Sequence, residues 1–471
     1  MDTKNAFYHG DCLFVMKHDI PPESIDLIYL DPPFFTGKVQ VGKWKGKWHP
    51  EAMEVSYEDS KKFWTEKASA MREKAPEWLK HVALKRPDFA SYLYYMMERL
   101  QACHKVLKQN GSIYLHCDWR ASHHLKMVMD EILGYNNFRN EIIWKRATPI
   151  GGKVKSKMMP RDHDSILYYV KTQQAPYHNQ YLPYSQEYID TYFKHKDKNG
   201  RVYRIQALGD YSEESREKFR KMGMIYKSRD GKEALIQYLD KSKGVLLDDI
   251  WIDREVIGLQ HKAFQKQSST EKTGYPTQKP EALLGRIIKI SSIEGDLVLD
   301  PFCGCGTTVI AASKLGRRFI GIDIDTSKRK ANDLPTAFEV IKNRSHDLFG
   351  QAEYISRDIN EVLEMNPKDF EDWVNEFYRA TKPMPDTGID GVTLDGVGIQ
   401  TKTFEIGYSV ISQLVQDAKY HHKTAKPVKK VIAVSQIGFD DKARQRKFEV
   451  ETAEGIEVQL ITPEALLTLE T

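Results

Sequence analysis

The 471-residue sequence contains few cysteines and no long hydrophobic segment, and each absence excludes a class of protein. Its five cysteines are spaced neither as zinc ligands nor as a disulfide framework, which predicts a reducing compartment. No apolar run approaches the roughly 20 residues of a membrane span, and the polar first residues lack the core of a signal peptide. We therefore expect a cytoplasmic protein with no membrane partner.

A strong charge of one sign is also absent. The 70 Lys and Arg residues exceed the 66 Asp and Glu residues by only four, which gives a net charge of +4. This small excess permits nucleic-acid binding through local patches without requiring it. A hydrophobic content of 41% and a charged content of 29% are typical of a globular protein. The length predicts two or three domains.

The first motif that indicates chemistry is the tetrapeptide Asp31-Pro32-Pro33-Phe34, which follows the apolar segment 26–30. The Asp31 carboxylate and the Pro32 carbonyl are both hydrogen-bond acceptors, so together they suit the two hydrogens of an exocyclic amino group. Pro33 has no N–H and cannot donate there. Phe34 offers a ring that could stack on the base carrying that amino group. The alternative is a simple turn with a hydrophobic lid.

A second motif lies in residues 297–323, where an apolar strand, a glycine-rich turn, a helical run and another strand predict a βαβ unit. The turn contains Gly304 and Gly306 but lacks the third glycine of the dinucleotide fingerprint. The second strand ends at Asp323, whose carboxylate suits ribose hydroxyls. Because this turn has no pyrophosphate to hold, it favours an adenosyl amino acid over NAD.

Together these motifs resemble the amino-group DNA methyltransferases of the β arrangement, in which the catalytic tetrapeptide precedes the S-adenosylmethionine loop. Residues 275–284 are similar to the family segment that leads into that loop, and residues 111–119 and 140–144 are similar to type III modification subunits. Residues 8–11 resemble the motif whose acid faces the adenine of the cofactor. The resemblance covers roughly residues 6–335.

The resemblance implies an α/β fold: a Rossmann-like, S-adenosylmethionine-dependent methyltransferase domain over 1–355, with a target-recognition region inserted at about 150–270. It implies methylation of adenine N6 in double-stranded DNA, with cytosine N4 as the alternative and methylation of RNA or of protein glutamine as a more distant one. The catalytic residues implied are Asp31, Pro32, Pro33 and Phe34. The cofactor-binding residues implied are Asp11, Thr277, Lys279, Asp300, Phe302, Gly304, Gly306 and Asp323.

Two other segments are candidate contacts with DNA. Residues 38–88 are predicted to form a loop followed by helices. Their four tryptophans either anchor these helices to the core or, over 38–48, belong to a flap above DNA or cofactor. Residues 145–161 form a basic connection between two β-rich runs, 142–144 and 165–170, that we expect to pair as a hairpin. This connection either contacts phosphates or is only a solvated face.

The resemblance to methyltransferases ends at about residue 335, and residues 360–471 are predicted to form a separate small α/β domain. The order Gly-Ile-Asp390-Gly followed by Gln400-Thr-Lys402 resembles the Mrr-like branch of the PD-(D/E)XK restriction endonucleases. Asp390 and Gln400 would supply oxygen ligands to Mg²⁺, and Lys402 would lie on the same strand face as Gln400. Glu371 on the preceding helix is a candidate for supporting the metal. The alternative is a nuclease-like fold that only binds DNA or a partner.

These resemblances imply a restriction-modification protein of a prokaryote or phage, with S-adenosylmethionine and Mg²⁺ as cofactors. Double-stranded DNA is the expected partner. A homodimer, and association with a restriction or helicase subunit, remain open alternatives.

Overall fold

The computed structural model describes most of the chain. The described residues are 4–38, 40–46, 49–57, 59–65, 75–146, 159, 161–251, 271, 273, 275, 277–324, 336–357, 362–363, 365–378, 380, 389–393, 397–424, 428, 430–454 and 456–468.

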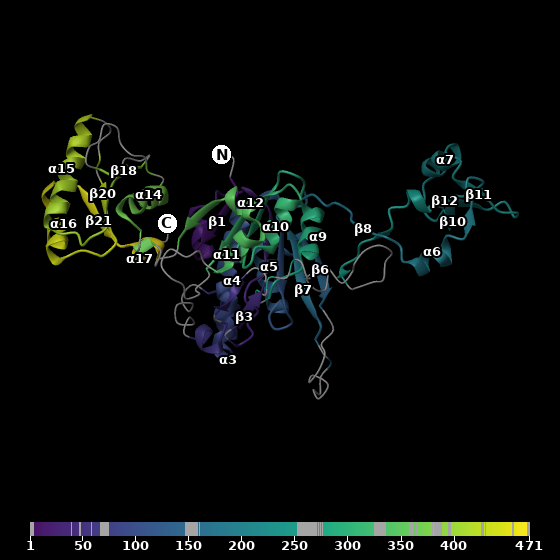
Figure 1. Cartoon of the computed structure of the whole chain (residues 1–471), viewed down its shortest axis with the longest axis horizontal. Helices are drawn as coiled ribbons and strands as arrows, with labels where there is room; N and C mark the ends of the chain where they lie inside the picture. The colour runs from purple at the N-terminus through teal and green to yellow at the C-terminus, as the bar shows by residue number, and fades with distance from the viewer. Residues whose placement is uncertain are drawn as a thin grey trace.

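A nine-stranded sheet forms the centre of the protein (Figure 1). Its strands, in spatial order, are β14 (Ile250–Trp251), β6 (Phe138–Lys145), β7 (His163–Val170), β5 (Leu107–Cys117), β2 (Ile25–Leu30), β15 (Leu297–Asp300), β16 (Arg318–Asp323), β1 (Ala6–His9) and β17 (Glu353–Ser356). β7 pairs antiparallel with both β5 and β6, whereas the other neighbours pair in parallel. Strands such as β2 and β15 are buried along their whole length, as expected for a parallel sheet covered on both faces.

Helices cover the two faces of this sheet and form two cores. One core contains α1 (Cys12–His18), α3 (Glu77–Lys85), α4 (Pro87–Val106) and α5 (Ser122–Leu133). The other contains α9 (Glu281–Ser291), α10 (Thr307–Lys314), α11 (Thr336–Arg344) and α12 (His346–Gly350). The domain is therefore a three-layer α/β structure.

The order of the central strands brings the two motifs of the sequence together. β2 and β15 are parallel neighbours, with Leu27 opposite Val298 and Ile28 opposite Leu299. Asp31 follows the end of β2, and Asp300 is the last residue of β15. Because parallel strands end at the same edge of a sheet, these two aspartates lie on one side of the molecule, where open α/β sheets place their ligands.

Residues between β7 and β14 form a separate lobe at one end of the molecule (Figure 1). Its four-stranded sheet is made of β11 (Ile225–Lys227), β12 (Glu233–Tyr238), β10 (Val202–Ala207) and β9 (His195–Lys196). The helices α6 (Gln186–Tyr192) and α7 (Glu213–Lys221) belong to it, and a ribbon of β8 (Tyr181–Leu182) and β13 (Val245–Leu246) connects it to the main sheet.

The C-terminal residues form a further lobe at the opposite end (Figure 1). Its sheet has the order β18 (Gly391–Val392), β19 (Val397–Lys402), β20 (Lys430–Ser435) and β21 (Glu457–Ile461). Its helices are α14 (Pro367–Phe377), α15 (Tyr408–Thr424), α16 (Asp441–Glu454) and α17 (Pro463–Thr468). Two core clusters within this lobe pack these elements together, and we call residues 362–468 the C-terminal lobe.

Several expected elements are confirmed and two are corrected. The hairpin of β6 and β7 forms as expected. The sequence of residues 6–35 predicts a strand, a turn and a strand at the entry to the sheet. The structure instead has the short helix α1 between the two strands, with Asp11 as its N-cap. The predicted loop near residue 40 is instead the antiparallel hairpin of β3 (Gln40–Gly46) and β4 (His49–Tyr57). Residues 147–158 of the basic connection lie outside the described residues.

The tryptophans of residues 38–88 can be assessed at two positions. Trp64 is buried, and its Nε1 donates a hydrogen bond to Asp59. Trp78 packs against the same core, and its Nε1 donates to Glu131 on α5. The prediction of anchoring tryptophans is confirmed for this pair, whereas the side chains of Trp44 and Trp48 lie outside the described residues.

Candidate active site

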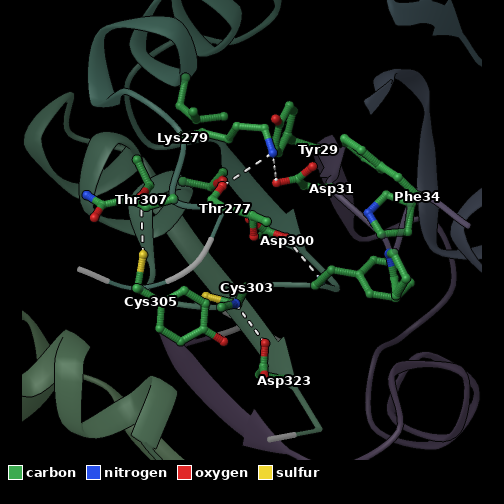
Figure 2. Close-up of a pocket in the computed structure, with 18 of the residues that line it drawn as sticks. Tyr29, Asp31, Phe34, Thr277, Lys279, Asp300, Cys303, Cys305, Thr307 and Asp323 are labelled. Carbon is green, nitrogen blue, oxygen red and sulfur yellow. Dashed lines mark hydrogen bonds and ion pairs between the residues drawn. The ribbon is translucent and has the colours of Figure 1, made fainter. Parts of the chain in front are cut away.

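A cavity of about 150 Å³ lies at the carboxyl ends of β2 and β15 (Figure 2). Both sequence motifs contribute to its wall, although more than 260 residues separate them in the chain. The predicted site residues that line it are Asp31, Pro32, Pro33, Phe34, Thr277, Lys279, Asp300, Phe302, Gly304 and Asp323. Asp11 and Gly306, which were also predicted, are not among the residues that line this cavity.

The catalytic carboxylate predicted from the sequence is paired with a lysine. Lys279 Nζ donates a hydrogen bond to Asp31 Oδ2, and its distance to the Thr277 carbonyl oxygen is 3.4 Å. The same ammonium lies 5.1 Å from the centre of the Phe34 ring. The resemblance assigned Lys279 to the cofactor, and no local pattern indicated its pairing with Asp31.

A buried polar chain supports the wall beneath Phe34. The ring of His116 lies 5.5 Å from that of Phe34, its Nδ1 is 2.8 Å from the hydroxyl of Tyr29, and its Nε2 is 3.3 Å from Asp164 Oδ2. Burial alone would raise the pKa of Asp164, but the hydrogen bond with His116 and the positive charges of Arg146 and Lys279 act against burial, and the pKa is lowered. Sequence reasoning missed these residues, because His116 and Asp164 are separated by 48 positions and meet only across β5 and β7.

The glycine-rich turn approaches the ligand side of the cavity with its backbone. Gly304 has φ +50° and Gly306 has φ +76°, a left-handed conformation that side chains rarely adopt. A Cβ on Gly304 would meet the Tyr275 ring at 3.2 Å. Gly304 N donates a 2.7 Å hydrogen bond to Asp323 Oδ2, which fixes the carboxylate at the tip of β16.

Asp300 is the most deeply buried of the three aspartates that line the cavity. It is 2% exposed, and it accepts a 3.0 Å hydrogen bond from Phe302 N at Oδ1. Burial raises the pKa of its carboxyl group to about 7, and the negative charges of Asp31 and Asp323 add to this effect. The hydrogen bonds from Thr308 and Phe302 oppose it by lowering the pKa. A cationic group entering the cavity would favour the ionised form of Asp300.

Asp11 has two structural partners in the described structure. Its Oδ1 accepts a 2.7 Å bond from Leu13 N as the N-cap of α1, and its Oδ2 forms a 2.5 Å ion pair with Arg99 Nη2. Arg99 is 4% exposed on α4, and its place as the one charged residue among the buried residues of that helix was the signal that sequence reasoning did not use. Asp11 lies near the end of β16, because the backbone N–H of its neighbour Gly10 donates a 2.9 Å hydrogen bond to the carbonyl oxygen of Asp323.

These features fit the adenosyl amino acid expected from the sequence. The backbone of Gly304 forms part of the cavity wall, and the carboxylate of Asp323 at a strand tip is suited to ribose hydroxyls. Asp300 and Lys279 offer partners for the ammonium and carboxylate of an amino acid. The roles assigned to individual residues stay predictions.

The candidate nuclease residues lie in the C-terminal lobe. Asp390 Oδ2 accepts hydrogen bonds from Thr401 N at 2.6 Å and from Thr401 Oγ1 at 2.9 Å. Gln400 is 6% exposed, and the side chains of Gln400 and Lys402 share one face of β19, opposite to that of Thr401. In the part of the chain that the structure describes, no group of three His, Cys, Asp or Glu side chains is placed to hold a metal. The Mg²⁺ site therefore stays a prediction.

No helix among the described residues is both long and apolar enough to span a membrane.

Comparison with known proteins finds a family described as DNA methylase, of the N6 and N4 type, whose profile matches residues 25–332. The type III restriction-modification enzyme StyLTI Mod subunit of Salmonella typhimurium strain LT2 is 26% identical over 449 residues, covering 86% of this chain and 64% of that protein. The chain thus spans less than two thirds of the length of that relative. Type II methyltransferase M.EcaI of Enterobacter cloacae is 27% identical, covering 77% of this chain and 74% of that protein.

Among solved structures, the M1.HpyAVI–SAM complex matches with a TM-score of 0.36 and 18% identity, covering 72% of this chain and 98% of that one. TTHA0409, a DNA modification methylase from Thermus thermophilus described as putative, matches with a TM-score of 0.37 and 16% identity, covering 74% of this chain and 99% of that one.

Proposed function

Since the chain belongs to the DNA methylase family of N6 and N4 enzymes, we propose that it methylates adenine N6 in double-stranded DNA with S-adenosylmethionine as the donor. The observation that carries this proposal is the shared cavity, whose wall contains both the Asp31 tetrapeptide and the Gly304 turn. Two binding sites in one cavity are what a direct transfer between two bound molecules requires.

Asp31 and Pro32 are the residues that would act on the target base. The Asp31 carboxylate and the Pro32 carbonyl accept the two amino hydrogens, which favours a tetrahedral nitrogen and frees its lone pair. When bound, S-adenosylmethionine supplies a methyl group on a sulfonium centre that needs no further activation. The negative charge of Asp31 stabilises the positive charge that develops on the amino nitrogen, and no proton has to leave that nitrogen beforehand.

The preference for adenine follows from the resemblance of Asp31-Pro32-Pro33-Phe34 to the tetrapeptide usual in adenine N6 enzymes. Cytosine N4 is the alternative, because both bases present an exocyclic amino group to the same acceptors. A base inside a duplex cannot reach the cavity, so the target must flip out of the stack at a cost of a few kcal/mol. Stacking on Phe34, a partly exposed ring at the rim of the cavity, would recover roughly 1–3 kcal/mol of that cost.

The remaining cofactor contacts are assigned by position. We propose that Asp323 binds the ribose hydroxyls, that Asp11 lies toward the adenine, and that Thr277 and Lys279 lie toward the methionine end. Asp300 would pair with the methionine ammonium. Phe302, Gly304 and Gly306 shape the turn beside them.

The experiment that tests the enzyme measures the transfer of a tritiated methyl group from S-adenosylmethionine to DNA, RNA and protein. Sequencing of modified bases in DNA from cells that express the chain then identifies the base and the recognition site. We expect N6-methyladenine in DNA. Methylated cytosine would correct the base, and label found only in RNA or protein would refute the proposal.

Replacement of Asp31 tests its role directly. We expect Asp31→Ala to lower methyl transfer to background while the chain remains folded and still binds S-adenosylhomocysteine, measured by calorimetry. Near-normal turnover in this variant would rule out Asp31 as the group that acts on the target amine.

The domain assignment is also part of the proposal. We assign the methyltransferase to residues 1–355 and target recognition to about 150–270. The lobe of β9 to β12 lies at one end of the molecule (Figure 1), contributes no described residue to the cavity wall, and contains exposed aromatic and basic side chains. A cytoplasmic location in a prokaryote or phage follows from the relatives, which are bacterial restriction-modification enzymes.

The C-terminal lobe has two candidate functions. A Mg²⁺-dependent endonuclease is supported by the order of Asp390, Gln400 and Lys402 along a β-rich segment. A docking site for a partner such as a restriction subunit is supported by the relative: the match to the StyLTI Mod subunit covers 86% of this chain, so it continues beyond residue 357 into this lobe. In the second case the chain is a methyltransferase alone.

Incubation with unmethylated plasmid and Mg²⁺ separates the two. The endonuclease hypothesis expects cleavage that Lys402→Ala abolishes while methyl transfer is kept. A plasmid that stays intact with both the unsubstituted chain and Lys402→Ala refutes the endonuclease hypothesis and leaves the docking hypothesis. Light scattering of the chain, alone and mixed with a restriction subunit, tests docking through the measured mass. The mass of the chain alone also reveals any homodimer.

A further inference from the structure

Lys279 occupies a position that the proposed function assigns to the target base. Its Nζ donates to Asp31 Oδ2 in a pair whose side chains are only 9% and 17% exposed (Figure 2). The ammonium also lies 5.1 Å from the centre of the Phe34 ring. A carboxylate meant to accept hydrogens from an amino group therefore already accepts one from an amine of the protein.

The charges around the cavity make this pairing a competition. Three of the described lining residues are aspartates, Asp31, Asp300 and Asp323, and Lys279 is the one lysine or arginine among them. The methionine end of the cofactor brings its own carboxylate into this acidic surrounding. The lining side chain suited to bind it is Lys279, whose single positive charge would then be shared between two carboxylates.

The pair in its present form also opposes the chemistry. The transfer places positive charge on the amino nitrogen, and an ammonium bound to Asp31 cancels much of the negative charge that would stabilise it. Lys279 would have to leave Asp31 for that carboxylate to act at full strength. The long, flexible lysine side chain permits such a movement.

We propose that Lys279 is a positioning residue that exchanges partners, bound to Asp31 before the cofactor enters and to the methionine carboxylate of the cofactor afterwards. This inference rests on the proposed function. The exchange leaves Asp31 available to the target amino group only when the methyl donor is present. Because coupling between two sites is reciprocal, cofactor and flipped base then strengthen each other's binding.

Calorimetric titration with S-adenosylhomocysteine tests the exchange without any knowledge of the DNA sequence. This probe has the methionine carboxylate but no sulfonium charge, so Asp31 does not attract its sulfur. The unsubstituted chain, Asp31→Asn, Lys279→Met and the double variant are compared. Asp31→Asn releases Lys279, so we expect its affinity for the probe to increase about three- to tenfold, the range of a partly exposed ion pair.

We expect Lys279→Met to weaken binding of the probe. In the double variant, Asp31→Asn should then no longer increase the affinity for the probe. Methylthioadenosine, which lacks the amino-acid end, is the matched control and should bind all four proteins within about twofold. Circular dichroism confirms folding, and Lys279→Gln replaces Lys279→Met if the latter does not fold.

Two results overturn the exchange while leaving the proposed function intact. One is an unchanged or weaker affinity of Asp31→Asn for S-adenosylhomocysteine, which indicates a fixed pair. The other is a gain that persists in the Lys279→Met background, which indicates that Asp31 repels the ligand without Lys279. A wild-type chain that binds no S-adenosylhomocysteine and methylates no DNA overturns the proposed function itself.

Discussion

Asp300 shows how burial sets the chemistry of a single residue in this cavity. It ends β15 in the interior, where burial raises the pKa of its carboxyl group to about 7 from an ordinary value of 3.8. The folded chain therefore holds this proton more tightly than the unfolded chain does. The stabilisation that follows is complete below about pH 4 and is lost as the pH rises through 7.

Asp300→Asn removes this dependence, because an amide cannot lose the proton and its oxygen can still accept the hydrogen bond from Phe302 N. We expect the free energy of unfolding of the variant, relative to the unsubstituted chain, to rise by about 3 kcal/mol or less between pH 4 and pH 8. Urea denaturation at each pH measures it. A constant difference across that range would contradict the pKa shift.

Phe34 permits a second prediction at this scale. Its ring, supported from beneath by His116, is the proposed platform for the flipped base. Phe34→Ala should lower kcat/KM for DNA by roughly 10- to 100-fold, since base stacking is worth about 1–3 kcal/mol. Phe34→Tyr is the control and should retain most of the activity. Equal losses in both variants would show that the ring does more than stack.

At the scale of elements, the turn before α10 depends on a residue without a side chain. Gly306 has φ +76° at the start of α10, and a Cβ there would lie 2.5 Å from Ile341 Cγ1 on α11. Both the backbone conformation and the packing of α11 against the turn exclude a larger residue. The turn can follow β15 only because this glycine lets the chain enter the helix so tightly.

Gly306→Ala should accordingly destabilise the protein by about 1–3 kcal/mol and weaken S-adenosylhomocysteine binding. Gly285→Ala is the matched control, because Gly285 lies inside α9 and a Cβ there would meet only Leu315 at 3.9 Å. That change should be neutral or stabilise by up to about 1 kcal/mol. Thermal unfolding and calorimetry measure both variants, and an undisturbed Gly306→Ala would refute the tight turn.

The sequence was sufficient for elements with strong periodic patterns and clear ends. The strand ends at Leu30 and Asp323 are found where they were predicted. Each is a short apolar or β-branched run bounded by turn residues, which determines the local structure. Helix α1 was missed because it has only seven residues, too few to show a helical period.

The contacts within the site could be predicted only in part. The meeting of the Asp31 and Gly304 segments followed from the resemblance of two motifs to one family. The pairing of Lys279 with Asp31 spans 248 positions and depends on the tertiary fold, which no local pattern records. The same holds for Arg99 and Asp11, which are 88 positions apart.

At the scale of the whole molecule, the C-terminal lobe contacts the methyltransferase near the start of the chain. Phe377 on α14 lies 5.7 Å from the Phe14 ring and 5.5 Å from the His18 ring of α1. Beside this contact, Arg357 pairs with Asp19 through two nitrogens, at 2.8 and 3.2 Å. Helix α1 thus has Asp11, a proposed cofactor contact, at its N-terminal end, and its Phe14 and His18 lie against Phe377 of the C-terminal lobe.

Removal of the C-terminal lobe tests whether this contact matters for the cofactor. None of the described residues that line the cavity lies beyond 324, so a chain of residues 1–360 should bind S-adenosylhomocysteine within about twofold of the full chain. It should unfold at a lower temperature, because the side chain of Phe14 loses its contact with Phe377 and becomes more exposed to water. Phe377→Ala in the full chain, which loosens only the contact with α1, is the control. The contrary outcome is a shortened chain that is folded but no longer binds S-adenosylhomocysteine, together with weaker binding in Phe377→Ala. In that case α1 transmits the position of the C-terminal lobe to Asp11, and a partner bound to that lobe could control methylation.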